Sequence, residues 1–238
     1  FKKRRFRIVH THFAKAGVLG RLAARMAGVP IVIHSIHGTT FPPTIPALSR
    51  YLYRTLERVA GGFTSVFIPV AEGLKQEYMA AGVGREDQYR VVHSGFDLAS
   101  FRESADSSPE KRLRIREELG LKAKNLVIGY VANLEPRKGH HHALEMMRRI
   151  VRRHPNAVLL LAGEGSHRSR LETDIQAWGL ERHVRLLGYR SDVARVLRAL
   201  DLKVFTSLWE GLPQALVQAA AAGVPIVAFD VDCVREAV

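Results

Sequence analysis

Short apolar runs and amphipathic stretches alternate along the chain. In the second half, apolar runs occupy residues 126–131, 157–161, 184–187, 202–205 and 225–229, and each has the length of a strand. Between these runs, apolar residues recur every three or four positions, as on a helix with one buried face. Helices are therefore expected at residues 139–153, 166–178, 193–200 and 213–222. Strands that alternate with helices predict parallel sheets covered by helices on both faces.

The first half shows the same alternation less regularly. Helices are expected at 14–27, 47–59 and 72–81, and strands at 8–9, 31–33, 65–70 and 91–92. A polar stretch at 101–109 interrupts the alternation, and such a break is typical of a domain boundary. The pattern predicts an α/β protein with two Rossmann-like, doubly wound domains, one over residues 1–103 and one over 104–238.

Composition excludes some classes of protein. Apolar residues make up 47% of the 238-residue chain and charged residues 25%, which is typical of a packed globule and not of a disordered chain. The single cysteine, Cys233, excludes an internal disulfide and fits a reducing compartment. The net charge of +13 favours anionic partners, which include nucleic acid, lipid head groups and phosphorylated small molecules.

Two clusters supply much of this charge. The cationic residues between positions 2 and 7 are expected to contact an anionic membrane surface, and those between 148 and 153 to form a solvated helix face. Residues 211–229 carry no charge, but Pro213, Gly223 and Pro225 interrupt them. The run therefore predicts a buried helix, a turn and a strand, and not a membrane span.

The segments that follow the strands contain the candidate chemistry, because doubly wound sheets bind ligands at the carboxyl ends of their strands. Arg137 and Lys138 precede an expected helix, whose free N–H groups and positive end favour a diphosphate. Glu210 follows another strand, directly before Gly211 and Leu212 at a second helix start. A carboxylate repels phosphate, so its presence there indicates a ligand in which a hydroxyl-rich group, such as a sugar, is attached to the phosphate.

Residues 207–228, Ser-Leu-Trp-Glu-Gly-Leu-Pro-Gln-Ala-Leu-Val-Gln-Ala-Ala-Ala-Ala-Gly-Val-Pro-Ile-Val-Ala, resemble the signature of family 4 glycosyltransferases, which have the GT-B fold. Other segments are similar to this family in the same order, and the resemblance covers nearly the whole chain. They are the Lys15-Ala-Gly-Val-Leu-Gly-Arg run, His37-Gly38, Val92-His-Ser-Gly-Phe-Asp97, Lys138-Gly139, Gly163-Glu-Gly165 and the Val184-Arg-Leu-Leu-Gly-Tyr run.

The resemblance implies a role for each matching residue. Lys138 binds the donor diphosphate, aided by Arg137, and Glu210 contacts the donor sugar. His37 lies near the transferred sugar, and Glu210 and His37 are the expected catalytic residues. The remaining expected donor-binding residues are Gly165, Gly188, Tyr189, Gly211, Leu212 and Gln218.

The chain departs from the family pattern at three positions. Gln218 replaces the second glutamate of the family motif, which grips the ribose, and so loses charge-assisted hydrogen bonds. Asn133 replaces the usual phosphate-binding arginine, and Cys233 stands where the family has glycine. Compared with the family, the first domain is expected to be incomplete and the second to be truncated at its end.

Histidines and paired aspartates raise the alternative of a metal site. Three consecutive histidines, 140–142, point about 100° apart on a helix and do not converge on one ion, so surface positions are expected. His10 and His12 alternate on a strand and are expected to serve packing. Asp230-Val-Asp232 resembles the metal-binding motif of the other glycosyltransferase fold, but it follows the last strand, and no metal is expected there.

The expected enzyme moves a hexose-type sugar from a UDP- or GDP-sugar to an acceptor hydroxyl, with retention of configuration and without a cofactor. A lipid-linked or glycan acceptor, glycan or glycolipid biosynthesis, and a cytoplasmic location at the inner face of the membrane fit the charge and the resemblance. Three alternatives stay open. One is a nucleotide-sugar 2-epimerase of the same fold, and another is a non-catalytic binder of anions or nucleic acid. The third is a catalytically inactive scaffold that resembles the donor domain, which the departures at Asn133 and Gln218 favour. A nucleic-acid partner is not expected, because aromatic and basic residues do not interleave.

Overall fold

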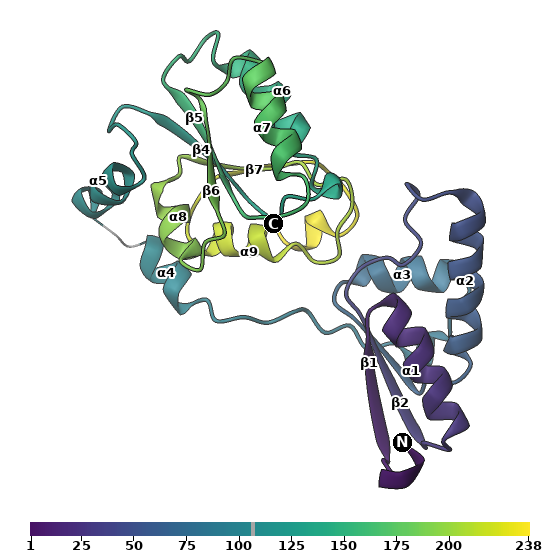
Figure 1. Cartoon of the computed structure of the whole chain (residues 1–238). Coiled ribbons are helices and arrows are strands. Elements are labelled where there is room, and N and C mark those ends of the chain that lie inside the picture. The colour runs from purple at the N-terminus through teal and green to yellow at the C-terminus, as the bar shows by residue number, and fades with distance from the viewer. Residues whose placement is uncertain (106–107) are drawn as a thin grey trace. The chain divides into compact units, whose positions relative to one another are not determined.

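The computed structural model describes residues 1–105 and 108–238, and the chain folds into two compact units (Figure 1). Unit 1 comprises Phe1–Gly95 together with the short segments Glu210–Leu212 and Asp232–Glu236. Unit 2 comprises Phe96–Trp209, Pro213–Val231 and Ala237–Val238. The helix α4 (Ala99–Ala105), which contains the predicted boundary between residues 103 and 104, groups with unit 2.

Unit 1 contains a parallel sheet of order β1-β2-β3. Its strands are β1 (Ile8–His12), β2 (Ile31–Ile36) and β3 (Val66–Pro69), and its helices are α1 (Ala14–Met26), α2 (Ala47–Gly61) and α3 (Glu72–Ala80), preceded by the short turn η1 (Lys2–Arg4).

The strand expected at 91–92 is wrong. Tyr89 forms an isolated bridge to Phe67, and Arg90 and Val92 donate backbone hydrogen bonds to β3 carbonyls, but no continuous ladder follows. The segment therefore lies along the edge of the sheet without becoming a strand.

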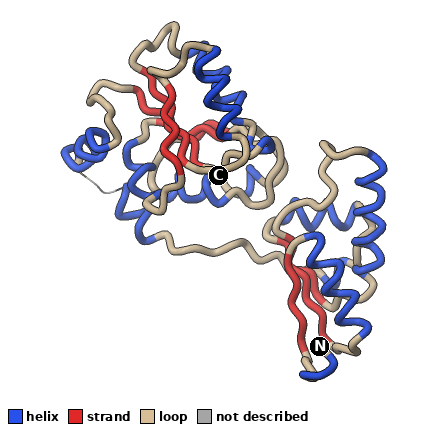
Figure 2. The backbone as a smooth tube through the Cα atoms, viewed as in Figure 1, coloured by secondary structure: helices blue, strands red, loops and turns tan. Residues whose placement is uncertain are grey.

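Unit 2 contains a five-stranded parallel sheet of order β6-β5-β4-β7-β8 (Figure 2). Its strands are β4 (Leu126–Val131), β5 (Ala157–Ala162), β6 (Val184–Gly188), β7 (Leu202–Phe205) and β8 (Ile226–Ala228). Its longer helices are α5 (Pro109–Glu118), α6 (His140–Ile150), α7 (Arg168–Ala177), α8 (Val193–Ala199) and α9 (Gln214–Ala221), and its short turn η3 is Pro136–Lys138. The expected α/β class is confirmed.

The sheet of unit 2 is covered on both faces, as its apolar strands predict. Every residue of β5 is buried, and β4 is buried at its four central positions. The core includes Val127, Leu160 and Leu197, together with Ala219 of α9. The uncharged run 211–229 forms α9, a turn and β8, as expected. Among the described residues, none of the helices combines the length and apolarity that crossing a bilayer requires.

The polar stretch at 101–109 is more ordered than its composition predicts. It contains the end of α4 and the start of α5, whereas its residues 106 and 107 lie outside the described part of the chain. The Ser108 side chain accepts a hydrogen bond of 3.3 Å from the backbone N–H of Lys111, and Pro109 occupies the first helical turn. The sequence interpretation missed α5 because few apolar positions mark this helix: Ile115 is buried, whereas most of its residues are charged.

A buried ion pair joins α1 to α2 in unit 1. The guanidinium of Arg21 donates a hydrogen bond of 2.6 Å to the carboxylate of Glu57, and the two side chains are 0% and 2% exposed. Burial raises the pKa of Glu57, and the charge of Arg21 opposes this shift. Because both side chains are buried, water cannot replace a missing partner, so the stability of this helix pair depends on both residues being present.

This dependence predicts strong coupling between the two residues. Arg21→Met leaves the Glu57 carboxylate buried without a partner and should lower the free energy of unfolding by about 3 kcal/mol. Arg21→Met combined with Glu57→Leu removes both charges and should recover most of the loss. Urea unfolding followed by circular dichroism measures both variants, and equal losses in the single and double variants would show that the pair is not coupled.

Candidate functional site

The loops after β4, β5 and β6 meet at the carboxyl edge of the unit 2 sheet. The backbone N–H of Leu134 donates to the Glu164 carbonyl at 2.8 Å, and His167 donates back to the Leu134 carbonyl at 2.9 Å. Gly163 in turn donates to the Gly188 carbonyl at 2.8 Å. The parallel pairing of these strands therefore brings the Gly163–Gly165 turn and Gly188 together.

The loop after β7 joins the same edge beside the two predicted cations. The Leu208 N–H donates to the Arg137 carbonyl at 2.8 Å, and the Thr206 hydroxyl donates to the Gly139 carbonyl at 2.9 Å. Arg137 and Lys138 form the turn η3 directly before α6. The Arg137 side chain makes an ion pair of 2.9 Å with Glu135, so part of its charge is already used within this loop.

Glycines allow these loops to approach one another. Gly139 has a φ of 61°, and a Cβ atom there would collide with the Thr206 carbonyl oxygen. Gly163 has a φ of 152°, and a Cβ atom there would collide with the Ala132 carbonyl oxygen. Side chains at either position would force the loops apart, so both glycines are needed for a continuous edge of backbone groups.

A buried polar cluster that sequence reasoning missed lies below this edge. The Tyr130 hydroxyl donates to the Lys138 carbonyl and lies 3.4 Å from the Ser207 hydroxyl. The ammonium of Lys203, on β7, lies 5.0 Å from the centroid of the Tyr130 ring, and the His140 ring lies 4.6 Å from the same ring. Tyr130 thus links a fully buried lysine to the backbone of the predicted diphosphate loop.

Lys203 and His140 are buried without hydrogen-bond partners for their side-chain nitrogens among the described residues. Burial, with a contribution from Lys138, lowers the pKa of Lys203 to about 7, and burial lowers the pKa of His140 to about 4. The expected surface position of His140 is wrong, because its ring packs against Tyr130. The one sequence signal for this cluster was a lysine, Lys203, within an otherwise apolar strand. A single lysine does not interrupt the strand pattern, so it was not selected as a candidate residue.

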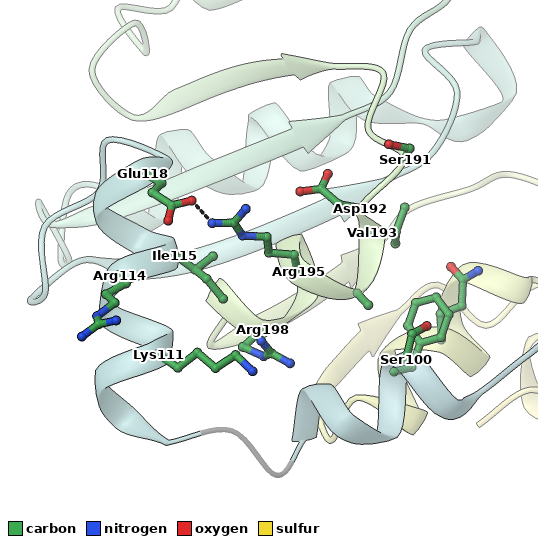
Figure 3. A pocket seen from close by; sticks show the side chains of 13 residues that line it. Ser100, Lys111, Arg114, Ile115, Glu118, Ser191, Asp192, Val193, Arg195 and Arg198 are labelled. Carbon is green, nitrogen blue, oxygen red and sulfur yellow. Dashed lines mark ion pairs between the residues drawn. The ribbon is translucent and has the colours of Figure 1, made fainter.

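Gln218 lies on α9 of unit 2. It lines a cavity of about 610 Å³ together with Asp192 and Val193 at the start of α8 and with cationic side chains of α5 and α8 (Figure 3). Within this cavity the ion pair between Arg195 and Glu118 is drawn as a dashed line in Figure 3. Tyr189, directly after Gly188, is 78% exposed and available to a ligand. The sequence interpretation missed the cavity because it did not expect α5.

His37 follows β2 in unit 1, at the carboxyl edge of that sheet. Its Nε2 atom lies 2.9 Å from Nδ1 of His12, so one hydrogen bond joins the two imidazoles. Burial and the nearby His12 lower the pKa of His37. His12 is exposed, and its ring packs against the rings of His10 and His37 at centroid distances of 4.3 Å and 5.2 Å, as expected. The Phe13 ring lies 5.2 Å from the His37 ring, centroid to centroid, in a tilted arrangement. The backbone φ of Phe13 is 60°, which is unfavourable for a bulky residue and is found most often at functional sites.

The remaining predicted residues, Glu210, Gly211 and Leu212, group with unit 1. The Glu210 backbone N–H donates to the Asp232 carboxylate at 2.8 Å, and Leu212 packs against the core of that unit. Within the described part of the chain, His, Cys, Asp and Glu side chains nowhere gather in threes as a metal ion would require.

Comparison with known proteins identifies relatives of both halves of the chain. Residues 111–238 match the family described as Glycosyl transferases group 1, and residues 1–100 match Glycosyltransferase Family 4. The chain is 32% identical over 234 residues to the Escherichia coli UDP-Gal:alpha-D-GlcNAc-diphosphoundecaprenol alpha-1,3-galactosyltransferase, a match that covers 97% of this chain and 59% of that protein.

Solved structures share the fold. Anabaena HepE in complex with UDP superposes with a TM-score of 0.80 and 26% identity, over 97% of this chain and 62% of HepE. HepE in complex with UDP-glucose gives a TM-score of 0.80 over 97% of this chain and 61% of that one. Sucrose-phosphate synthase from Thermosynechococcus elongatus, at 20% identity, has a TM-score of 0.78 over 95% of this chain and 56% of that one. The chain thus spans roughly three-fifths of the length of these relatives, and the expected GT-B fold is confirmed.

The buried ammonium of Lys203 predicts a pH-dependent stability. Its folded pKa of about 7 lies below the ordinary 10.5, so the unfolded chain binds more protons between these values. The free energy of unfolding should therefore rise with pH across this window. Lys203→Met should be more stable than the wild type at pH 7, by at least about 1 kcal/mol, and the difference should shrink towards pH 10.

Urea unfolding of both proteins at several pH values measures this difference. Because other titrating groups are shared, only Lys203 contributes to the change with pH in the difference between them. A difference that stays constant from pH 7 to pH 10 would contradict the assignment.

Proposed function

We propose, on the premise that this chain belongs to the group 1 glycosyl transferases of family 4, that it transfers a hexose-type sugar from a UDP-sugar to an acceptor hydroxyl. The observation that carries the proposal is the edge of unit 2, where glycine turns bring backbone groups of four loops beside Lys138. At such an edge the Lys138 ammonium and the positive N-terminal end of α6 favour a diphosphate.

Lys138 is proposed to hold the donor diphosphate. It lies at the positive end of α6, a helix of 11 residues, and its backbone is fixed by Tyr130 and by the loop after β7. Arg137 contributes less, because Glu135 already accepts a hydrogen bond from it. Gly165, Gly188 and the exposed Tyr189 are proposed to surround the diphosphate and the base.

Glu210 is proposed to orient the hydroxyl groups of the donor sugar, with backbone contacts from Gly211 and Leu212. Gln218, in the cavity beside α8, is proposed to bind the ribose through neutral hydrogen bonds. His37 is proposed to lie near the transferred sugar, where the lowering of its pKa by burial and by His12 favours the neutral imidazole. The imidazole of His12 fixes the orientation of the His37 ring.

The reaction breaks the bond between the anomeric carbon and the diphosphate oxygen and forms a bond from that carbon to the acceptor oxygen. Positive charge develops on the sugar, as in glycoside hydrolysis, while negative charge develops on the leaving diphosphate. Lys138 and the helix N-terminus would stabilise that negative charge. We propose retention of configuration and chemistry that uses no cofactor beyond the donor itself.

Donor and acceptor are proposed from the relatives. HepE binds UDP and UDP-glucose, which favours a UDP-sugar over a GDP-sugar. The name of the E. coli relative gives a sugar on diphosphoundecaprenol as its acceptor, which favours a lipid-linked acceptor here. We therefore propose that the protein acts in glycan or glycolipid biosynthesis at the inner, cytoplasmic face of the membrane.

A nucleotide-sugar 2-epimerase remains a second candidate, because it would use the same fold and the same donor. Product analysis separates the two reactions. A transferase releases UDP in equal amount to the glycosylated acceptor, whereas an epimerase changes the sugar and needs no acceptor.

Lys138 and Glu210 should contribute to the binding of different parts of the donor. Lys138→Ala should weaken UDP and UDP-sugars alike by about tenfold or more, because it removes a charge-assisted contact to the diphosphate. Glu210→Ala should weaken the UDP-sugar while leaving UDP unchanged, because Glu210 faces only the sugar. Titration calorimetry with UDP, UDP-glucose, UDP-galactose, UDP-N-acetylglucosamine and GDP-mannose measures each affinity.

Lys124→Ala is the matched control, since it removes an exposed lysine from another loop of unit 2 and should change nothing. If Lys124→Ala and Lys138→Ala weaken UDP equally, binding follows overall charge and the donor site is misassigned. If DNA competes as well as UDP, the protein is an anion binder and not a transferase.

A further inference from the structure

The side chain of Lys203 is enclosed by unit 2, at a strand position where packing favours an apolar residue. Lys203 lies on β7, pairs with Gly129 of β4 and donates its backbone N–H to the Pro225 carbonyl at 2.8 Å. It is 0% exposed, and its amine has no hydrogen-bond partner among the described residues. A buried lysine without a carboxylate partner costs stability, and a methionine would fill a similar space at a lower cost. Packing alone therefore does not account for Lys203.

Aromatic and basic groups surround this amine. The Lys203 ammonium lies 5.0 Å from the centroid of the Tyr130 ring, and the His140 ring packs 4.6 Å from the same ring, centroid to centroid. The charge of Lys138 acts on both Lys203 and His140, and His167 acts on His140. Within the described part of the chain, the side chains that act on Lys203 thus supply no negative charge to compensate its burial.

The cluster lies directly below the edge where the loops of unit 2 meet. Phe205, the last residue of β7, follows Lys203 by two positions, which corresponds to about 7 Å along a strand. The Tyr130 hydroxyl, on the same ring that faces Lys203, donates to the Lys138 carbonyl of the loop above. A charge at this depth acts on an anion at the edge through the protein interior, where salt screens the interaction weakly.

An anion at this edge opposes the effects that disfavour the charged lysine. Burial and the positive charge of Lys138 lower the pKa of Lys203 to about 7. A diphosphate has the opposite charge to Lys138, so its arrival favours the ammonium form of Lys203 and raises this pKa. Binding of the proton and binding of the diphosphate are therefore linked, and each strengthens the other by the same factor.

We propose that the Lys203 amine takes up a proton from solvent when the diphosphate of a nucleotide sugar binds at the edge above it. The ammonium so formed attracts the diphosphate from below without touching it, and the proton returns to solvent when the nucleotide leaves. During sugar transfer the same charge would favour the departing diphosphate. The inference rests on the proposed donor site and assigns a role to a residue that does not contact the donor.

Titration calorimetry in buffers that differ in ionisation enthalpy measures this proton uptake directly. UDP-glucose and UDP-galactose are suitable probes, because both of their phosphates are esterified and do not titrate near neutral pH. At about pH 8, where ordinary histidines are neutral, the wild type should take up about half a proton or more per bound nucleotide sugar. Lys203→Met should take up none.

The pH dependence of affinity gives a second readout. The wild type should lose affinity for these probes as the pH rises from about 7 to about 9, because the linked proton becomes harder to bind. Lys203→Met lacks this contribution. The wild type should therefore bind about fivefold or more tightly than Lys203→Met at pH 7, and the ratio should approach one at pH 9. A purely structural role of Lys203 would give a ratio that does not change with pH.

His140→Leu is the matched control, because it removes the other buried titratable group of the cluster and should keep the proton uptake of the wild type. Thermal melting by circular dichroism confirms that both variants are folded. Equal uptake by the wild type and Lys203→Met would overturn the inference, as would uptake that disappears only in His140→Leu.

The same titrations separate this inference from the proposed function. Binding that Lys138→Ala weakens, but that takes up no proton in the wild type, leaves the donor site standing and contradicts the role of Lys203 alone. If the wild type binds neither nucleotide sugar, the proposed donor site and the inference fail together.

Discussion

The parallel pairing of β6, β5, β4 and β7 is the constraint on which the candidate site depends. Parallel neighbours end at one edge, so four loops that are far apart in sequence meet there and exchange backbone hydrogen bonds. The strands tolerate this arrangement because they are apolar and covered on both faces. Gly139 and Gly163 then allow backbone to approach backbone where a side chain would collide.

Both units bury ionisable side chains in their interiors. In unit 2, Lys203 and His140 pack around Tyr130 below the loops, where burial keeps both largely uncharged above neutral pH. In unit 1, Arg21 and Glu57 neutralise each other between two helices. Buried polar groups of this kind cost stability but restrict how their elements pack. In unit 1 the helix pair is fixed from within, and its apolar residues are free to face outward.

The strands of the sheets could be predicted from the sequence, whereas helix α5 and the buried cluster around Lys203 could not. Strands such as β5 are apolar at every position, and their alternation with helices predicts the parallel pairing that the sheet shows. Helix α5 was not predicted, because most of its residues are charged and the apolar positions that would mark its buried face are few. Lys203 was missed because one polar residue does not break a strand pattern, and its burial depends on β8 pairing with β7, a contact distant in sequence.

Among the predicted site residues, the loops bring Arg137, Lys138, Gly165 and Gly188 to one edge, whereas Gln218 lines a cavity together with residues of α5 and α8. Strand order was sufficient to place the first four, because each lies next to a strand end. Gln218 sits one turn into α9, where the direction of a side chain depends on helix packing and not on strand order. The pairing of His37 with His12 likewise required the register of β1 with β2.

The central claim is that the carboxyl edge of the unit 2 sheet binds a nucleoside diphosphate, and amide NMR spectra recorded during a titration with UDP test it most directly. Saturable shifts are predicted for the glycine amides of this edge, Gly139, Gly163, Gly165 and Gly188, with no change at Gly28 or Gly82, which are turn glycines of unit 1. Shifts confined to the basic residues between 2 and 7, or absent from all four edge glycines at saturating UDP, would contradict it.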